Sequence, residues 1–317
     1  MDCYVTCWDG TEYLLPQRLE WEFGYGLGSP CDAFRLVCVW TPGMEKRLAD
    51  AVRFRAVEQG EVVFTGVVDE YQCIQDRKGS RMELSGRGLQ GLLLDNESLP
   101  MEYRTATWKE ILRDHVTPYG IEAEASSFLR VVPVFAVESG QSEWSVLRDF
   151  VCYHNGKTPR FDRTGKLVVS DWKDETTVVV DDSTTVTRLT YGESRYGVLS
   201  EVVVRDRVRN AVERVRNEAF SAKGGRCRRV MTVAGRSSGA AMRYTGDYQL
   251  RASRGEQVRC EVTLPTLFAA FPGELVSVER TGFEGNGVYR VVEAVVGVSA
   301  GGAYTELTLG DPDVLIT

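Results

Sequence analysis

GEVVFTGVVDEYQCIQDRKGSRMELSGRGLQGLLL, residues 60–94, is the stretch that decides the fold: an apolar run, a turn, an alternating strand and a glycine stop. Residues 273–309, GELVSVERTGFEGNGVYRVVEAVVGVSAGGAYTELTL, repeat this order. Residues that alternate in polarity and end at turn glycines predict antiparallel strands with one buried face. Because the pattern occurs twice in one chain, it favours two related β-barrels.

The repeat is built from three matching pieces. Residues 60–63 correspond to 273–276, residues 65–70 to 288–293, and residues 79–86 to 302–310 with one residue inserted. The match is a match of pattern more than of identical residues. It therefore predicts two structurally related sheets rather than two closely similar domains.

Length and composition describe an ordinary globular protein. The 317 residues are enough for two or three domains, and 43% hydrophobic with 26% charged residues is typical of soluble chains. No apolar run approaches the ~20 residues of a membrane span, and the first ten residues lack a basic, apolar leader. We therefore expect synthesis in a host cytoplasm without a signal peptide, and no membrane insertion.

The charge and the cysteines exclude several classes of function. A net charge of −7 argues against specific nucleic-acid recognition, which usually needs a basic surface. The eight cysteines are scattered, with no CxxC pair and no histidine at zinc-binding spacing. They are expected to be free and mostly buried thiols, and no metal or cofactor is predicted.

The order of elements predicts an α+β, mainly β fold of three domains. Residues 1–99 contain at least six expected strands and form a first β-barrel, comparable to a tube protein. Residues 100–175 form a small α+β domain. Residues 176–317 form a second β-barrel, interrupted by a helix around 237–253. Two related antiparallel β-barrels thus flank the small domain.

Helix signals are clearest in the small domain. Thr107 followed by Glu110 is a capping box, and helical spacing continues until Pro118. A second helix is expected to begin at Ser142, and a hairpin with a turn at Gly165 follows it. Both helices are too short to persist alone, so they must be held by packing.

Two motifs that could carry chemistry have simpler structural explanations. Gly86, Gly88 and Gly91 match the dinucleotide pattern GxGxxG, but the preceding strand alternates in polarity instead of being apolar throughout. A turn that ends the sheet is therefore favoured. His115 and His154 lie at the ends of short helices, where a cation favours the helix dipole, and neither has a nucleophile in a known motif.

A basic segment stands out against the acidic chain. It is either a solvated hairpin or an electrostatic docking surface for an acidic neighbour. The candidate residues of that surface are Arg205, Arg207, Arg209, Arg214, Arg216, Arg226, Arg228 and Arg229.

The order of segments resembles a known family. It runs SGRGLQGLLLDNE (85–97), ATWKEILRDHVTPYGIEAE (106–124), ESGQSEWSVLRDFVCYHNGKTPRFDRTGKLVVSD (138–171) and FPGELVSVERTGFEGNGVYRVVEAVVGVSAGGAYTELTLGD (271–311). This order is similar to baseplate hub proteins of contractile phage tails, including the Mu-like hub and PBSX-like prophage hubs, and to the first part of type VI secretion spike proteins. The most specific piece is the helix and hairpin around Trp144, Leu147, Phe150, Asp162 and Gly165.

The resemblance implies a structural role in a tail or tail-like particle. Such hubs are homotrimers, and two like barrels per subunit give a ring of approximate sixfold symmetry. The ring can join a hexameric tail tube protein to a trimeric spike protein, and its channel passes DNA or a tape-measure protein. No β-helical needle follows this region, so the resemblance implies that the spike is a separate protein.

The leading hypothesis is therefore a non-enzymatic trimeric hub and symmetry adapter. One alternative is a tail-associated cell-wall hydrolase that uses acids such as Glu143, Asp149 and Asp162, which would require two carboxylates ~5–10 Å apart in a cleft. The other is a β-rich carbohydrate-binding adhesin, which would present exposed aromatic residues in a groove.

Overall fold

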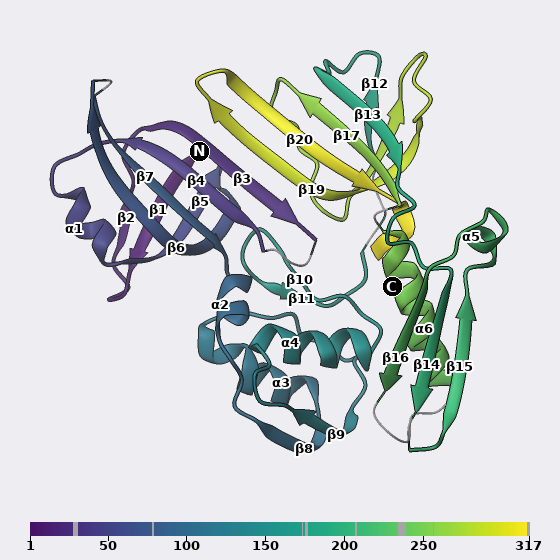
Figure 1. Cartoon of the computed structure of the whole chain (residues 1–317). Coiled ribbons are helices and arrows are strands. Elements are labelled where there is room, and N and C mark those ends of the chain that lie inside the picture. The colour runs from purple at the N-terminus through teal and green to yellow at the C-terminus, as the bar shows by residue number, and fades with distance from the viewer. Residues whose placement is uncertain are drawn as a thin grey trace. The chain divides into compact units, whose positions relative to one another are not determined.

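The computed structural model describes residues 1–27, 31–77, 79–172, 174, 177–206, 208–233, 239–255 and 257–315 (Figure 1). The fold is mainly β with large antiparallel sheets, which confirms the predicted class at this level. Two compact units divide the chain. The first unit is Met1–Asp171, Pro265–Ala269 and Glu293–Glu306, and the second is Trp172–Leu264, Ala270–Val292 and Leu307–Thr317.

The first unit begins with a sheet of antiparallel strands. Its elements are β1 (Asp2–Cys7), β2 (Glu12–Leu14), β3 (Arg18–Gly26), β4 (Ala33–Val39), α1 (Met44–Ala49), β5 (Ala51–Glu58), β6 (Glu61–Asp76), β7 (Gly79–Gly88) and α2 (Gln90–Asp95). The strands follow the order β3-β4-β7-β6-β5-β1-β2, an open path in which no pairing between described residues closes a ring. The predicted closure into a barrel therefore stays a prediction.

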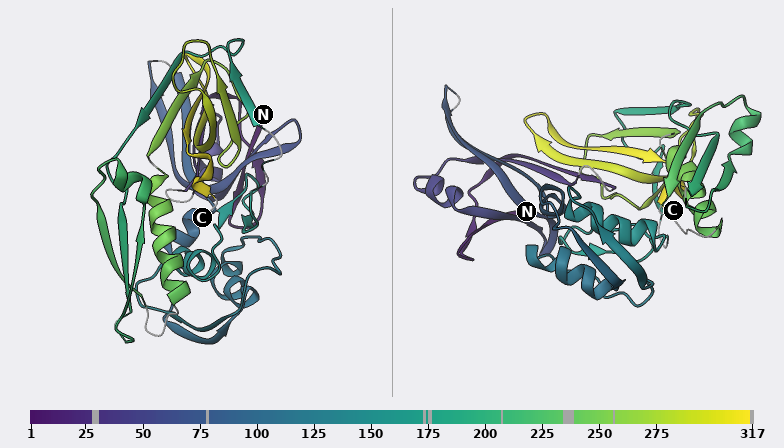
Figure 2. Two further views of the ribbon diagram at one scale, coloured as in Figure 1. Left: turned by 90° about the vertical axis from the view of Figure 1, so that its right-hand side faces the viewer. Right: turned by 60° about the horizontal axis from the view of Figure 1, so that its bottom comes forward.

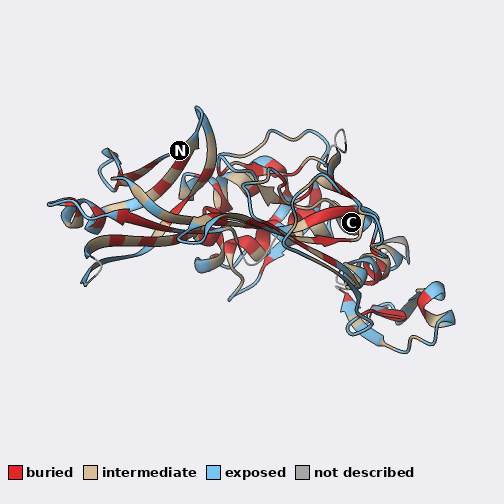
Figure 3. Ribbon diagram, turned by 90° about the horizontal axis from the view of Figure 1, so that it is seen from above, coloured by how far each residue is buried: buried red, intermediate tan, exposed pale blue. Residues whose placement is uncertain are grey.

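Alternation of side chains builds the core of this sheet. Along β7, buried positions recur at every second residue, and Figure 3 shows the same alternation on neighbouring strands of the unit. Four phenylalanines meet inside: Phe34 stacks on Phe54 with centroids 3.9 Å apart, and Phe23 stacks on Phe64 at 5.1 Å. The aromatic positions Phe54 and Phe64 come from the hairpin β5–β6, part of which opens the fold-deciding stretch.

Two glycines let the paired strands β6 and β7 approach each other closely. A Cβ on Gly66 would lie 2.2 Å from the carbonyl oxygen of Arg87, and one on Gly86 would lie 1.9 Å from that of Val67. No side chain fits in this space, so both positions require glycine. The pairing of β6 with β7 shifts register nearby, between Val68 and Glu70.

The rest of the first unit contains the predicted helices and hairpin. The elements are β8 (Met101–Ala106), α3 (Trp108–His115), η1 (Thr117–Tyr119), β9 (Val132–Val137), α4 (Glu143–Arg148), η2 (Asp149–Tyr153), β10 (Arg160–Phe161) and β11 (Leu167–Val168). Thr107 and Glu110 form the expected capping box, and Ser142 caps α4. The antiparallel pair β8–β9 was not predicted.

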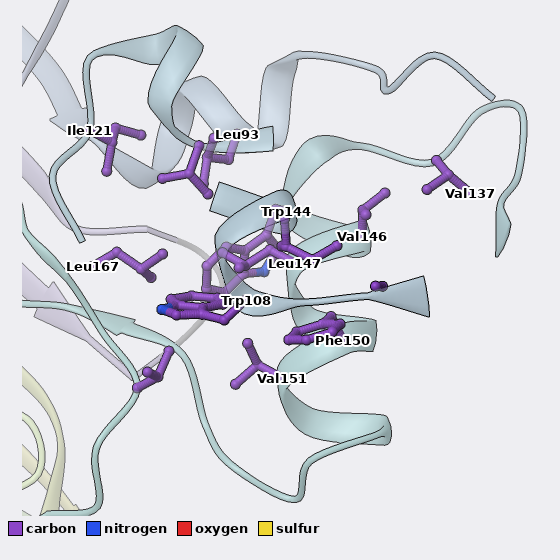
Figure 4. Close-up of a cluster of buried hydrophobic side chains, with 14 of the residues drawn as sticks. Leu93, Trp108, Ile121, Val137, Trp144, Val146, Leu147, Phe150, Val151 and Leu167 are labelled. Atoms are coloured by element: carbon purple, nitrogen blue, oxygen red, sulfur yellow. The ribbon is translucent and has the colours of Figure 1, made fainter. Parts of the chain in front are cut away.

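A hydrophobic core holds these short helices, as their length requires. Leu93 of α2, Trp108 of α3, and Leu147 of α4 are among the side chains that pack together (Figure 4). Trp108 and Phe150 stack with centroids 6.3 Å apart. Packing therefore supplies the stability that helices of six to eight residues lack on their own.

The second unit combines two kinds of sheet. Its elements are β12 (Thr177–Asp181), β13 (Arg188–Glu193), β14 (Glu201–Asp206), β15 (Ala211–Arg216), α5 (Glu218–Ala222), β16 (Arg228–Val233), α6 (Gly239–Arg254), β17 (Val258–Leu264), β18 (Leu275–Glu279) and η3 (Pro312–Leu315), with parts of β19 (Gly287–Ser299) and β20 (Gly302–Gly310). β13 pairs with β17 and β18 with β19, both antiparallel, whereas β12 pairs with β18 in parallel.

The strands β14, β15 and β16 form a separate three-stranded sheet in the order β15-β14-β16. β14 and β15 are antiparallel, but β14 and β16 are parallel. The helix predicted around 237–253 is α6; residues 237 and 238 lie outside the described residues. What interrupts the strands of the second unit is thus a sheet with its own helix rather than a helix alone.

The repeat is preserved in its turns but not in all its pieces. Gly79 opens β7 with φ 114° and Gly302 opens β20 with φ 106°, as the sequence match predicts. The piece at residues 60–63 lies in β6, which pairs with β5, whereas the piece at 273–276 reaches β18, which pairs with β12 and β19. This part of the match joins strands that hold different places in their sheets.

Candidate interaction surface

The predicted basic residues, Arg205 to Arg229, run from the end of β14 through β15 and α5 to the start of β16, and α6 packs on the sheet that these strands form. Strand alternation assigns successive residues to opposite faces. On one face Val202 and Val204 pack with Met242 and Leu250 of α6 in a small core. Figure 2 shows α6 lying along this face of β14, β15 and β16. The helix covers one side of the sheet, and most side chains on the other side are exposed.

The uncovered side, here called the open face, is an array of nine residues set by the strand registers. Its three rows run across β15, β14 and β16: Arg216–Glu201–Arg228, Arg214–Val203–Val230 and Val212–Arg205–Thr232. Four of the nine are arginines and one is an acid. The open face is therefore basic, with valines between the guanidinium groups.

Glu201 anchors three of the arginines. Nη1 of Arg214 lies 3.4 Å and Nε of Arg216 3.3 Å from Oε1 of Glu201, and Nε of Arg228 donates to Oε2. The side chain of Glu201 is 8% exposed, whereas the three arginine side chains keep 56%, 58% and 62% of their surface exposed. Arg228, followed by the other two, holds the pKa of the Glu201 carboxyl below its usual range.

The structure divides the eight predicted arginines. Arg205, Arg214, Arg216 and Arg228 lie on the open face. The remaining described members have other positions: Arg209 in the turn after β14, Arg226 with Nη1 donating to the carbonyls of Ser221 and Gly225, and Arg229 donating to Gln249 of α6. Arg207 lies outside the described residues.

The sequence could not separate these groups. Alternation along a single strand gives two faces, but the face covered by a helix depends on which strands pair and in which direction. The central position of Glu201 was missed for the same reason, although its opposition to Arg216 and Arg228 follows once the registers are known.

The three acids of the hydrolase alternative are engaged in separate structural roles. Asp162 accepts hydrogen bonds from the backbone N–H of Thr164 and Lys166 in the β10–β11 turn. Asp149 accepts from the side chain of Gln141 at 3.0 Å, and burial raises the pKa of its carboxyl. The turn role of Asp162 is a common one for aspartate.

Glu143 lies in a buried polar network instead of a cleft. Its carboxylate is 2.6 Å from Nδ1 of His115, accepts from Tyr119 at 3.0 Å, and is bonded to the hydroxyl of Ser98. The other ring nitrogen of His115 is 2.9 Å from the hydroxyl of Tyr103. His115 lies in the last turn of α3, as expected, but it is only 2% exposed and contacts Glu143 rather than solvent.

This network does not have the arrangement of a hydrolytic triad. In such a triad one imidazole nitrogen faces the nucleophile and the other faces the acid. Here Ser98 and Glu143 approach the same nitrogen, Nδ1 of His115. Since Ser98 is also buried, the group is suited to holding α3 and α4 together.

The GxGxxG glycines lie in elements rather than in the expected turn: Gly86 and Gly88 belong to β7 and Gly91 to α2, where close packing limits the space for a side chain. A Cβ on Gly88 would lie 3.2 Å from that of Asp32, and one on Gly91 would lie 3.4 Å from the side chain of Arg87. Arg87 forms paired hydrogen bonds with Asp69 and with Asp95, which tie β6 and α2 to β7. Since β7 pairs with antiparallel neighbours, the motif is not in a dinucleotide-binding βαβ unit.

The described residues hold no group of three or more His, Cys, Asp or Glu side chains placed to bind a metal ion. All eight cysteines are free thiols, as predicted, and Cys3, Cys7, Cys38 and Cys260 are buried. In the part of the chain that the structure describes, no helix is both long enough and apolar enough to cross a membrane.

Comparison with solved structures defines the fold as that of bacteriophage tail proteins. No protein-family model and no curated protein matches the chain. A tail protein from Neisseria meningitidis MC58 is similar with a TM-score of 0.80 and 18% identity, over 99% of this chain and 98% of that one. The 43 kDa tail protein of prophage MuSo2 from Shewanella oneidensis has a TM-score of 0.78 and 16% identity, over 99% and 100%.

A type VI secretion component is also similar. This Escherichia coli protein, described as structurally similar to the T4 tail proteins gp27 and gp5, has a TM-score of 0.57 and 10% identity, over 93% of this chain and 73% of that one. The resemblance identified from the sequence, to tail hubs and to type VI spike proteins, is thereby confirmed at the level of the fold.

Proposed function

We propose that this protein is a structural component of a phage tail or tail-like particle. The observation that carries the proposal is the similarity to the Neisseria tail protein, which extends over 99% of this chain and 98% of the other. A match of that extent leaves no additional domain of this chain to account for. The predicted localisation, assembly into a phage particle after synthesis without a signal peptide, belongs to this proposal.

More specifically, the protein acts as a homotrimeric baseplate hub and symmetry adapter. It joins a hexameric tail tube protein to a trimeric spike protein and lines part of the central channel. Two related barrels in each of three subunits present six similar units to the tube and three to the spike. The turn glycines Gly79 and Gly302, which open β7 and β20 with similar φ angles, support such a duplication.

The three-part organisation remains part of the proposal. Residues 1–99 form the tube-like barrel, 100–175 the small α+β domain, and 176–317 the second barrel with its insertion. The acidic balance of the chain suits a channel that passes DNA or a tape-measure protein without binding it.

The role is non-enzymatic. The engagement of Glu143 and Asp162 in the network and the turn described above supports this, since a glycosidase needs two carboxylates facing one cleft.

Light scattering and negative-stain electron microscopy of the purified chain test the adapter. We expect the mass of three chains and class averages of a threefold ring, because a permanent assembly buries more than ~2,000 Å² at an interface. The tube protein added in a second experiment should bind the ring on one face. A monomer at all concentrations, alone and with the tube protein, would contradict the trimeric hub.

A further inference from the structure

The open face of the β14–β15–β16 sheet is basic and partly apolar. The helix α6 packs on the opposite face and does not cover it. We propose that it is a contact surface for a second copy of this chain, which it meets through that copy's acidic surface outside residues 199–254. The inference rests on the proposed trimer and deepens it by naming a surface that joins the subunits.

Charge is distributed unevenly along the chain. Residues 199–254 contain thirteen Lys and Arg against five Asp and Glu, whereas the rest of the chain contains 25 and 40. Two copies can therefore attract each other even though each carries a net charge of −7. A contact between unlike patches is heterologous, and such contacts form closed rings when the rotation between subunits permits. That is the geometry a threefold hub requires.

The arginines of the open face are positioned before any partner arrives. Arg216 and Arg228 bond Glu201 through Nε, and Arg214 bonds it through Nη1, while each side chain keeps more than half of its surface exposed. One carboxylate cannot neutralise three cations, so the open face retains positive charge. Side chains already held in place lose less conformational entropy on binding, which favours association with carboxylates.

The valines indicate that the partner is a protein surface. Val212 is 48% exposed and Val230 58% exposed, on the two outer strands of the open face. A phosphate backbone is bound by cations and polar groups and gains little from aliphatic neighbours. Protein interfaces combine buried apolar contacts with arginine anchors. A nucleic-acid partner is thus disfavoured, and DNA binding becomes an outcome of the test.

The test variant is Arg205→Glu/Val230→Asp in the full chain. Arg205 is exposed and lies in a different row from Glu201, so the double variant leaves the buried carboxylate and its three arginines intact. The matched control is Arg243→Glu/Ala252→Asp, which changes two exposed residues of α6, on the opposite side of the sheet. Both variants change the charge equally. Thermal unfolding of each checks that folding is unaffected.

The readout is the association constant, measured by sedimentation at 0.1 M salt. We expect the open-face variant to lose about a hundredfold or more in self-association, because like charges facing each other cost several kcal/mol. The control should keep wild-type association. In the wild type, raising salt to 1 M, where the Debye length falls to ~3 Å, should also weaken the assembly.

Each other result overturns the inference. If the open-face variant assembles as the wild type does, this surface is not between subunits, yet the trimeric hub stands. A wild type that is monomeric at all concentrations would contradict both the hub and the inference. Tight, salt-sensitive binding of a 20-base-pair DNA probe, lost in the open-face variant without change in self-association, would assign the face to nucleic acid instead.

Discussion

Replacing Arg290 by methionine should destabilise the second unit strongly. Arg290 is 2% exposed, yet its guanidinium bonds three separate parts of the unit. Nη1 and Nη2 bond Asp174 at 2.6 and 2.9 Å, Nη1 bonds the carbonyl of Gly273 at 2.8 Å, and Nε bonds that of Pro312 at 2.6 Å. The side chain thus joins the segment before β12, the turn before β18 and the final helical turn to β19.

The magnitude follows from what each partner loses. Removing one member of a buried ion pair costs about 3–5 kcal/mol. Asp174 is 40% exposed and regains water, so its part of the loss is smaller. The carbonyl of Gly273 is buried, and a buried acceptor left without its donor costs about 1–3 kcal/mol. We expect a loss of about 3 kcal/mol in the free energy of unfolding of the second unit.

Arg280→Met is the matched control. Arg280 bonds only neutral acceptors, the carbonyls of Asp181 and Thr184 at 2.8 and 2.9 Å. Its loss should be about 1 kcal/mol. Urea unfolding followed by hydrogen exchange of the β19 amides measures both variants within the same unit.

Acid provides a second check on Arg290. Hydrogen bonding to Arg290 holds the pKa of Asp174 below its ordinary value of 3.8. A carboxyl with a depressed pKa adds stability above its ordinary pKa and loses it as the pH falls. The difference in free energy of unfolding between the wild type and Arg290→Met should therefore become smaller below about pH 4. If Arg290→Met loses no more free energy of unfolding than Arg280→Met at pH 7, the proposed role of Arg290 in joining these segments is refuted.

Three further predictions concern the first unit. Burial raises the pKa of Asp32 from 3.8 to about 6, so the wild type loses stability as the pH rises through this interval. Urea unfolding should therefore show Asp32→Asn to be more stable than the wild type by about 1–3 kcal/mol at pH 7.5. At pH 3.5 the two proteins should be equally stable. Gly86→Ala should cost about 3 kcal/mol because its Cβ meets the Val67 carbonyl, whereas in Gly24→Ala the new Cβ is 3.9 Å from its nearest neighbour and thermal unfolding should be unchanged. Thr107→Ala removes the cap of α3 and should cost about 1 kcal/mol, with Thr107→Ser close to wild type in the same assay; equal losses in both would contradict the capping role.

Local signals predicted helices α3 and α4 of the first unit well, whereas α1 and α2 were not predicted. Thr107, Glu110 and Ser142 act within their own helical turns, so their roles can be read from adjacent residues. The hairpin turn at Gly165 is equally local, with φ 80°. The pair β8–β9 was missed because its strands are 25 residues apart and β9 contains a proline, which weakens the strand pattern.

Features that depend on strand pairing were predicted less well. The pattern EVVVRD of β14 puts both valine and charged residues on each side of the strand, so its sequence does not reveal which side a helix covers. The contact of His115 with Glu143 was not predicted because the two residues lie 28 positions apart in the sequence. The piece of the repeat at residues 60–63 matched 273–276 because both begin at a turn glycine, although the strands that follow pair differently.

The inserted sheet keeps folding and recognition on separate sides of the same three strands. Val202 and Val204 face α6, while Arg205 and its neighbours face away, so substitutions on one side leave the other nearly untouched. Relatives with this fold can therefore change the residues of the open face while the core between the strands and α6 stays the same. The partner that the open face accepts can therefore change faster during evolution than the fold itself.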